Sequence, residues 1–140
     1  MTVERYFKTA LPLTLAGIAF AGYMTGVKLF SGACAFNESC PTLWGLPSCA
    51  YGLVIFILMF LVTLVALKRK KIDLRPIKQN LFLSGLGILF SGYFAVPEII
   101  TLVSGRGPGY MLGLPTCAYG LVFYIVIFIV TLVAVMKNRR

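Results

Sequence analysis

Residues 46–54 read LPSCAYGLV, and residues 114–122 repeat them as LPTCAYGLV. The match continues down the apolar run that follows, so that 15 of the 22 aligned positions are identical. Pro, Cys, Tyr and Gly recur in one register, which chance matching between apolar segments does not produce. Self-similarity at a fixed period indicates a duplicated structural unit. The chain is therefore expected to contain two copies of one supersecondary unit.

The chain contains four apolar stretches, at about residues 9–31, 46–67, 81–103 and 114–136. Each is long enough to cross a bilayer, which takes about 20 residues. Hydrophobic residues make up 59% of the 140 residues and charged residues only 12%, and the mean hydropathy is +0.93. This composition excludes a disordered chain, a coiled coil and a disulfide-rich secreted miniprotein. No stretch alternates polar and apolar residues, so each is expected to span as a helix rather than as a barrel strand.

The first and third stretches also match each other, more weakly. Gly17-Ile18, Phe20 and Gly22-Tyr23 align with Gly87-Ile88, Phe90 and Gly92-Tyr93 at an offset of 70 residues. The repeated unit is thus a helix, a loop and a second helix. An even number of spans per unit makes the two copies parallel, related by an axis along the membrane normal. We predict an all-α membrane protein, a four-helix transmembrane bundle made of two parallel-repeated hairpins. Residues 1–140 would form a single domain, with repeats at about 9–71 and 79–140.

The basic residues indicate the orientation of the chain in the membrane. Of 13 Lys and Arg, 11 flank the first span, lie between the second and third spans, or follow the fourth. By the positive-inside rule, both termini and the middle loop are expected in the cytoplasm, and the loops at about 32–45 and 104–113 outside a cell membrane. The basic run at residues 68–71 is short, lies against a span and has no interleaved aromatic residues. We therefore expect a lipid bilayer, and no nucleic acid, as its partner.

The repeated motif has two interpretations. In one, Pro47 and Pro115 lie in the first turn of a helix, where proline loses no hydrogen bond. Cys49 and Cys117 would then lie at the positive end of a helix dipole, which favours a reactive thiolate. In the other, the motif only begins a helix, and each Cys is a small apolar residue that packs in the core.

All four cysteines are expected at or near the outer face, where an oxidising compartment permits disulfides. Cys34 and Cys40 share one short loop, and Cys49 and Cys117 are related by the repeat. Three interpretations remain open: a structural Cys34–Cys40 disulfide, a redox relay from loop thiols to a membrane-embedded pair, and a four-Cys metal or iron–sulfur site. The metal site is disfavoured because no CxxC ligand pair is present, and the prediction is that the chain binds no metal.

The order of these elements resembles the vitamin K epoxide reductase family over residues 34–64, with an echo at residues 113–132. The resemblance lies in the outer Cys pair, Gly-Leu-Pro, a small residue, Tyr-Gly-Leu and a long apolar helix. It implies a four-helix bundle that transfers electrons between protein thiols and a quinone, with Cys34 and Cys40 as the loop shuttle pair. That family has a CxxC near the outer end of its last helix, where this chain has only Cys117, so Cys49 would be its partner.

Aromatic and charged residues near the outer ends of the spans are further candidates. Trp44, Tyr51 and Tyr119 would line a quinone pocket, or would only anchor helices at the membrane interface. Lys28 and Glu98 correspond under the repeat alignment, and charges inside a span are costly unless they pair or serve a function. We expect a Lys28–Glu98 contact, although a long Lys side chain also reaches the interface unaided.

Two functions follow as hypotheses. The first is an integral membrane thiol–disulfide oxidoreductase that exchanges electrons between its outer cysteines, an extracytoplasmic thiol protein and a quinone. The chain has no His to relay protons, so its chemistry would rest on cysteine. The second is a non-enzymatic four-helix protein, a small complex subunit or transporter-like bundle, with a structural disulfide in its outer loop.

Overall fold

The computed structural model describes residues 2–31, 42–70, 73–105 and 116–139. These residues form four long helices: α1 (Val3–Ser31), α2 (Ser48–Arg69), α3 (Arg75–Val103) and α4 (Thr116–Asn138). Two short strands, β1 (Thr42–Leu43) and β2 (Leu46–Pro47), pair antiparallel just before α2. All four helices are long and apolar enough to cross a membrane. The predicted all-α fold and four-helix transmembrane bundle are confirmed.

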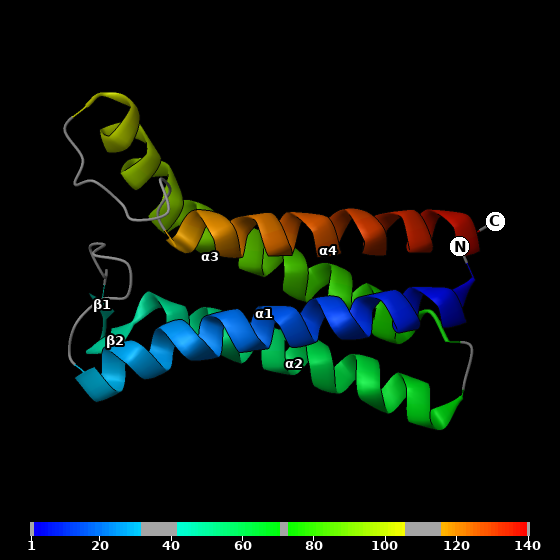
Figure 1. Cartoon of the computed structure of the whole chain (residues 1–140). Helices are drawn as coiled ribbons and strands as arrows, with labels where there is room; N and C mark the ends of the chain where they lie inside the picture. Colours follow the sequence, from blue (N-terminus) through cyan, green and yellow to red (C-terminus); the bar gives the residue numbers. More distant parts are fainter. Residues whose placement is uncertain (1, 32–41, 71–72, 106–115, 140) are drawn as a thin grey trace.

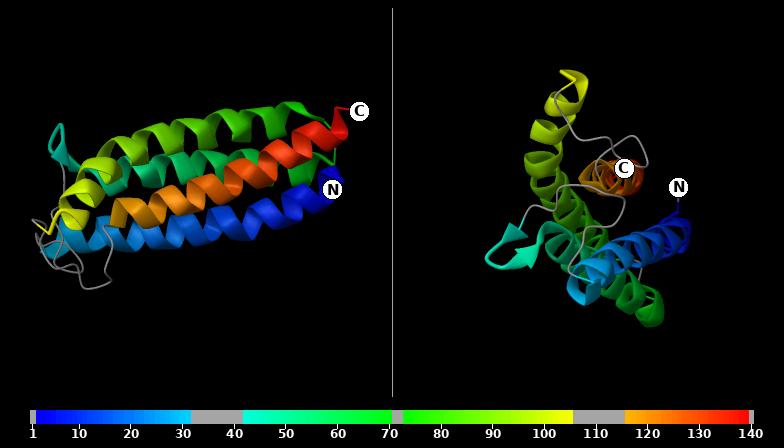
Figure 2. Two further views of the ribbon diagram at one scale, coloured as in Figure 1. Left: turned by 90° about the horizontal axis from the view of Figure 1, so that it is seen from above. Right: turned by 60° about the vertical axis from the view of Figure 1, so that its left-hand side comes forward.

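The four helices lie roughly along one common axis (Figures 1 and 2). The start of α1, the end of α2, the start of α3 and the end of α4 lie together at one end of the bundle, here called the terminal end. The strands and the starts of α2 and α4 lie at the opposite end, here called the loop end. The described basic residues that are expected in the cytoplasm therefore belong to one end of the molecule: Arg5, Lys8, Lys68, Arg69, Lys70, Arg75, Lys78, Lys137 and Arg139.

The helix boundaries differ from the expected spans for identifiable reasons. Helix α1 begins at Val3 and α3 at Arg75, each about six residues before the apolar stretch, because polar residues continue a helix beyond the hydrocarbon region. Helix α2 begins at Ser48, since Leu46 and Pro47 pair with β1 instead. Pro47 consequently lies just before the helix and not in its first turn. Pro115 lies outside the described residues.

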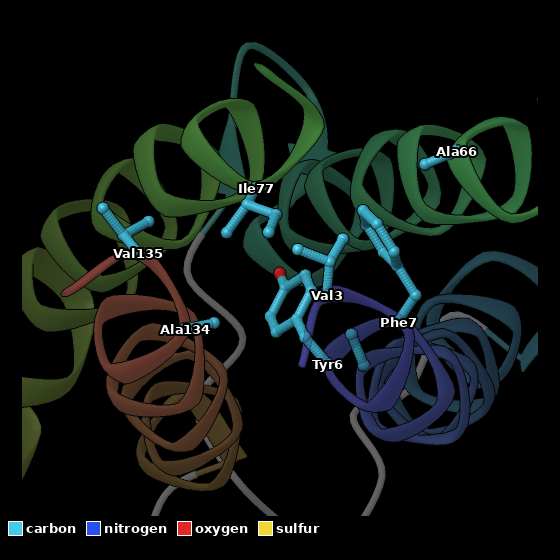
Figure 3. Packing of buried hydrophobic residues seen from close by; sticks show 8 residues of the cluster. Val3, Tyr6, Phe7, Ala66, Ile77, Ala134 and Val135 are labelled. Atoms are coloured by element: carbon cyan, nitrogen blue, oxygen red, sulfur yellow. The ribbon is translucent and has the colours of Figure 1, made fainter. Parts of the chain in front are cut away.

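The hairpins contain two buried hydrophobic clusters. One is at the terminal end, where Figure 3 shows Tyr6, Ile77 and Ala134 facing a common centre from three different helices. The other lies nearer the loop end and includes Ala21, Phe56 and Tyr124. Glycine and alanine recur at these helix contacts, as they do where helices associate in lipid through close packing.

The last turns of α3 lean away from the other helices (Figure 1), and Pro97 lies within this helix. Proline removes a backbone hydrogen bond inside a helix and forces its ring against the preceding turn. Beyond Pro97, Ile100 and Val103 are 62% and 82% exposed within the protein. Helix α1 also contains a proline within its length, Pro12.

Candidate functional site

A narrow pocket lies between the two hairpins, toward the loop end. Its walls come from all four helices, and nearly all of its surface is apolar. The cavity volume is about 40 Å³, which is space for about three water molecules. The residues that line it are Phe20, Ala21, Ser48, Cys49, Gly52, Phe56, Phe90, Ser91, Phe94, Gly120 and Tyr124.

The pocket lies on the pseudo-two-fold axis that the repeat predicts. Phe56 and Tyr124 occupy equivalent positions in α2 and α4, and their rings stack with centroids 4.3 Å apart and an interplanar angle of 6°. Two equivalent residues touch each other only where a symmetry axis passes between them. Gly52 and Gly120, also equivalent, both line the same pocket.

Two further aromatic contacts connect the hairpins in a symmetric way. Tyr51 of α2 contacts Phe90 of α3, with ring centroids 5.8 Å apart. Tyr119 of α4 contacts Phe20 of α1 at 6.2 Å. Phe20 and Phe90 themselves line the pocket, so each tyrosine contacts a residue of the pocket wall.

One hydrogen bond breaks the symmetry. The Tyr124 hydroxyl donates to the backbone carbonyl of Gly52 over 2.8 Å, from the second hairpin to the first. The equivalent residue, Phe56, has no hydroxyl. The two hairpins therefore have different side chains at this equivalent position beside the axis, Phe56 in the first and Tyr124 in the second.

Cys49 is the one candidate thiol whose surroundings are described. It lies in the first turn of α2, is half-buried, and lines the pocket. The positive end of the helix dipole lies at this turn. Cys117 is the second residue of α4, at the equivalent helix start, but its side chain is outside the described part of the chain. Cys34 and Cys40 also lie outside the described residues.

The candidate quinone-binding residues differ in their placement. Trp44 lies in the turn between β1 and β2 with a φ of 53° and is 92% exposed, so it lies apart from the pocket. Tyr51 and Tyr119 are half-buried and adjoin the pocket through Phe90 and Phe20. The structure brings these two together around one site and leaves Trp44 at the surface.

Lys28 lies in the last turn of α1, and Glu98 directly follows Pro97 in α3. Both side chains are half-buried. Glu98 borders a shallow groove on α3 beside Pro97, together with Gly92 and Tyr93. The Lys28–Glu98 contact stays a prediction.

The sequence reasoning missed a polar layer buried at the terminal end. Asn80 donates from Nδ2 to the Tyr6 hydroxyl over 3.1 Å and to Thr63 Oγ1 over 2.9 Å. The Tyr6 hydroxyl also bonds Thr131 Oγ1 over 3.0 Å. All four side chains are fully buried, and each comes from a different helix. The layer therefore connects the whole bundle at one level.

Part of this layer was visible in the repeat. Thr63 and Thr131 are identical at equivalent positions, and each hydroxyl donates to the carbonyl four residues earlier in its own helix. Tyr6 and Asn80 are not equivalent under the repeat, so no pattern pointed to them. Within the described part of the chain, the buried Asn80 Oδ1 has no hydrogen-bond partner, which is costly in an apolar interior.

Among the described residues, no group of three or more His, Cys, Asp and Glu side chains is placed to hold a metal ion. No protein-family model matches this chain. No curated protein and no solved structure matches it either.

Proposed function

We propose that this protein is an integral membrane thiol–disulfide exchange protein whose reactive thiols lie at the loop end. The observation that carries the proposal is Cys49, half-buried in the first turn of α2 on the wall of the axial pocket. The repeat provides Cys117 at the equivalent start of α4, which borders the same pocket through Gly120. Two cysteines that lie on opposite sides of a two-fold axis suit a reversible disulfide.

The electrons would pass in three exchanges. A dithiol of an extracytoplasmic partner reduces a Cys34–Cys40 disulfide and leaves as the partner's disulfide. The loop dithiol then reduces a Cys49–Cys117 disulfide through a mixed disulfide, in which the attacking thiolate displaces one sulfur as a thiolate. Finally, the Cys49 and Cys117 thiols give two electrons and two protons to a quinone, which becomes a quinol.

The size of the pocket restricts where a quinone would bind. Pockets that hold organic ligands have volumes of about 300 to 1,000 Å³, and this cavity holds about 40 Å³. The proposal therefore places the quinone ring outside the pocket, at the lipid-facing edge beside Tyr51 or Tyr119. The resemblance to the vitamin K epoxide reductase family supports quinone as the acceptor, and the single Cys117 in place of a CxxC is the departure from it.

The same proposal includes the orientation in the membrane. The terminal end carries the basic residues that flank the spans, and positive charge accumulates on the cytoplasmic side of membrane proteins. The loop end and its cysteines would then face an oxidising compartment, which the proposed disulfides need.

The proposal is tested on the full chain reconstituted in lipid nanodiscs. Dithiothreitol serves as the dithiol and decyl-ubiquinone as the acceptor, and quinone reduction is followed by absorbance. Cys49→Ser and Cys117→Ser should each reduce the rate to the uncatalysed background. Cys34→Ser should retain the reaction with this small dithiol, because dithiothreitol reaches the inner pair directly, and is the matched control.

Disulfide mapping in the same samples separates the two candidate functions. Alkylation before and after reduction should recover a Cys49–Cys117 disulfide in the oxidised wild type. The second candidate, a non-enzymatic bundle, is favoured by the small cavity and by the extensive contacts between the hairpins. Quinone reduction that is unchanged in Cys49→Ser and Cys117→Ser would refute thiol exchange and support this second candidate.

A further inference from the structure

A groove with a basic rim opens between α2 and α3 at the terminal end. Its volume is about 420 Å³. The end of α2 provides Arg69 to the rim and the start of α3 provides Arg75, and both are exposed. Leu61 and Val65 line the groove deeper in the bundle and are 48% and 46% exposed. The groove therefore combines an apolar wall with a charged edge.

The spacing of these residues matches the dimensions of a lipid. Leu61, Val65 and Arg69 are four residues apart, so they follow one face of α2. A helix rises 1.5 Å per residue, which puts Leu61 about 12 Å below Arg69 along the helix. A headgroup phosphate at Arg69 would thus leave the first part of an acyl chain against Val65 and Leu61.

The rim is suited to a phosphate. Guanidinium groups form paired hydrogen bonds with phosphate oxygens, and two of them approach this site from different helices. Gln79, one turn into α3, adds an amide to the lining. Asp73 also lines the groove, and its Oδ1 accepts the backbone N–H of Arg75 over 3.1 Å. Its negative charge weakens the positive field without cancelling it.

The repeat provides an internal control for this site. Lys137 and Arg5 are the equivalents of Arg69 and Arg75 at the junction of α4 and α1, and both are exposed. There, however, Tyr6 replaces Pro76, and its fully buried side chain reaches from α1 to Thr131 of α4. The two junctions have the same pair of basic charges, but Tyr6 occupies the space between the helices at only one of them.

We propose that the groove between α2 and α3 is a binding site for one anionic phospholipid, with the phosphate at Arg69 and Arg75 and an acyl chain along Val65 and Leu61. Basic sites between transmembrane helices at the cytoplasmic side suit acidic headgroups. The proposal does not depend on the thiol chemistry at the loop end.

Native mass spectrometry of the full chain in detergent, with added phosphatidylglycerol or phosphatidylcholine, tests this site. The wild type should retain one phosphatidylglycerol in preference to phosphatidylcholine. Arg69→Gln with Arg75→Gln should weaken that binding by roughly 20- to 30-fold, about fivefold for each charge removed. Arg5→Gln with Lys137→Gln removes the same charge and should change it less than threefold. Asp73→Asn should strengthen it, by up to about fivefold.

Three results would overturn the proposal. Equal weakening by the two double variants would show a general effect of charge and no specific groove. Equal retention of the two lipids would show that the headgroup charge is not recognised. Displacement of the lipid by millimolar inorganic phosphate would show an ion site that does not use the apolar wall.

Discussion

Phe56 and Tyr124 stack face to face across the pseudo-two-fold axis, with ring centroids 4.3 Å apart. Each ring also lies on a glycine of the helix that precedes it in the chain: Phe56 on Gly17 and Tyr124 on Gly87. A Cβ atom added at Gly17 would lie 2.5 Å from two carbons of the Phe56 ring, and one at Gly87 would overlap the Tyr124 ring. In each hairpin, an aromatic ring of the second helix therefore packs against a glycine of the first helix. The two rings also stack on each other and so connect the hairpins.

We predict that Gly17→Ala and Gly87→Ala each destabilise the bundle. Overpacking of a well-filled core costs about 1–3 kcal/mol, and each ring is held in place by the other. Gly26→Ala in α1 and Gly92→Ala in α3 are the matched controls, because a Cβ at either position meets no atom of the described residues within 4 Å. Alanine is the better helix former by up to about 1 kcal/mol, so these controls should be neutral or slightly stabilising. Unfolding by sodium dodecyl sulfate in mixed micelles measures the free energy, and equal effects in all four variants would contradict the prediction.

Tyr124→Phe should lower the free energy of unfolding by about 0.5–1.5 kcal/mol, the usual net value of one hydrogen bond. The variant removes only the hydroxyl that donates to the Gly52 carbonyl and leaves the stacked ring in place. It also makes the central pair identical in the two hairpins. Tyr93→Phe is the control, since that side chain is 77% exposed. A Tyr124→Phe protein as stable as the Tyr93→Phe protein would show that the bond across the axis adds nothing.

The bundle was predictable because the sequence shows both the length of each apolar stretch and the recurrence of particular residues. Apolar length predicted the four helices, and the recurrence of residues 46–54 at 114–122 predicted that they form two copies of one hairpin. The axial pocket is lined by one recurring pair, Gly52 and Gly120, as a two-fold axis between the hairpins allows. Phe56 and Tyr124 occupy equivalent positions but are different residues, so the identical positions of the repeat did not include them.

The polar layer was not predictable in this way. Asn80 is one polar residue between the basic loop and an apolar span, which in sequence is typical of a helix end at the membrane surface. Only the packing of α3 places it opposite Thr63 and Tyr6, residues 17 and 74 positions away in the chain. Pro12 and Pro97 both lie inside helices, α1 and α3, so the presence of a proline did not by itself indicate which helix would bend.

A double-mutant cycle measures what this layer contributes. Thr63→Val and Asn80→Leu remove opposite ends of the 2.9 Å bond, and their coupling energy should be about 0.6 kcal/mol and at most about 1.7 kcal/mol, the range for hydrogen bonds between membrane helices. Asn80→Leu should cost less than two lost bonds imply, because it also removes the unpartnered Oδ1. Thr101→Val is the control, since its hydroxyl donates only to carbonyls of its own helix. Coupling between Asn80 and Thr101 as large as that between Asn80 and Thr63 would contradict a specific contact between α2 and α3.

The two ends of the bundle should be accessible from opposite sides of the membrane. In a chain whose four cysteines are replaced by serine, Trp44→Cys introduces a thiol at the 92% exposed turn of the loop end, and Thr2→Cys one at the exposed start of the terminal end. A membrane-impermeant maleimide added to intact cells should label the first and not the second. The reason is that 11 of the 13 basic residues flank the spans on the side expected in the cytoplasm, by the positive-inside rule. Both should react after the membrane is permeabilised, which is the control for reactivity. Labelling of Thr2→Cys alone in intact cells would invert the orientation and put the proposed redox thiols in the reducing compartment, where the structural and redox disulfides would both be disfavoured.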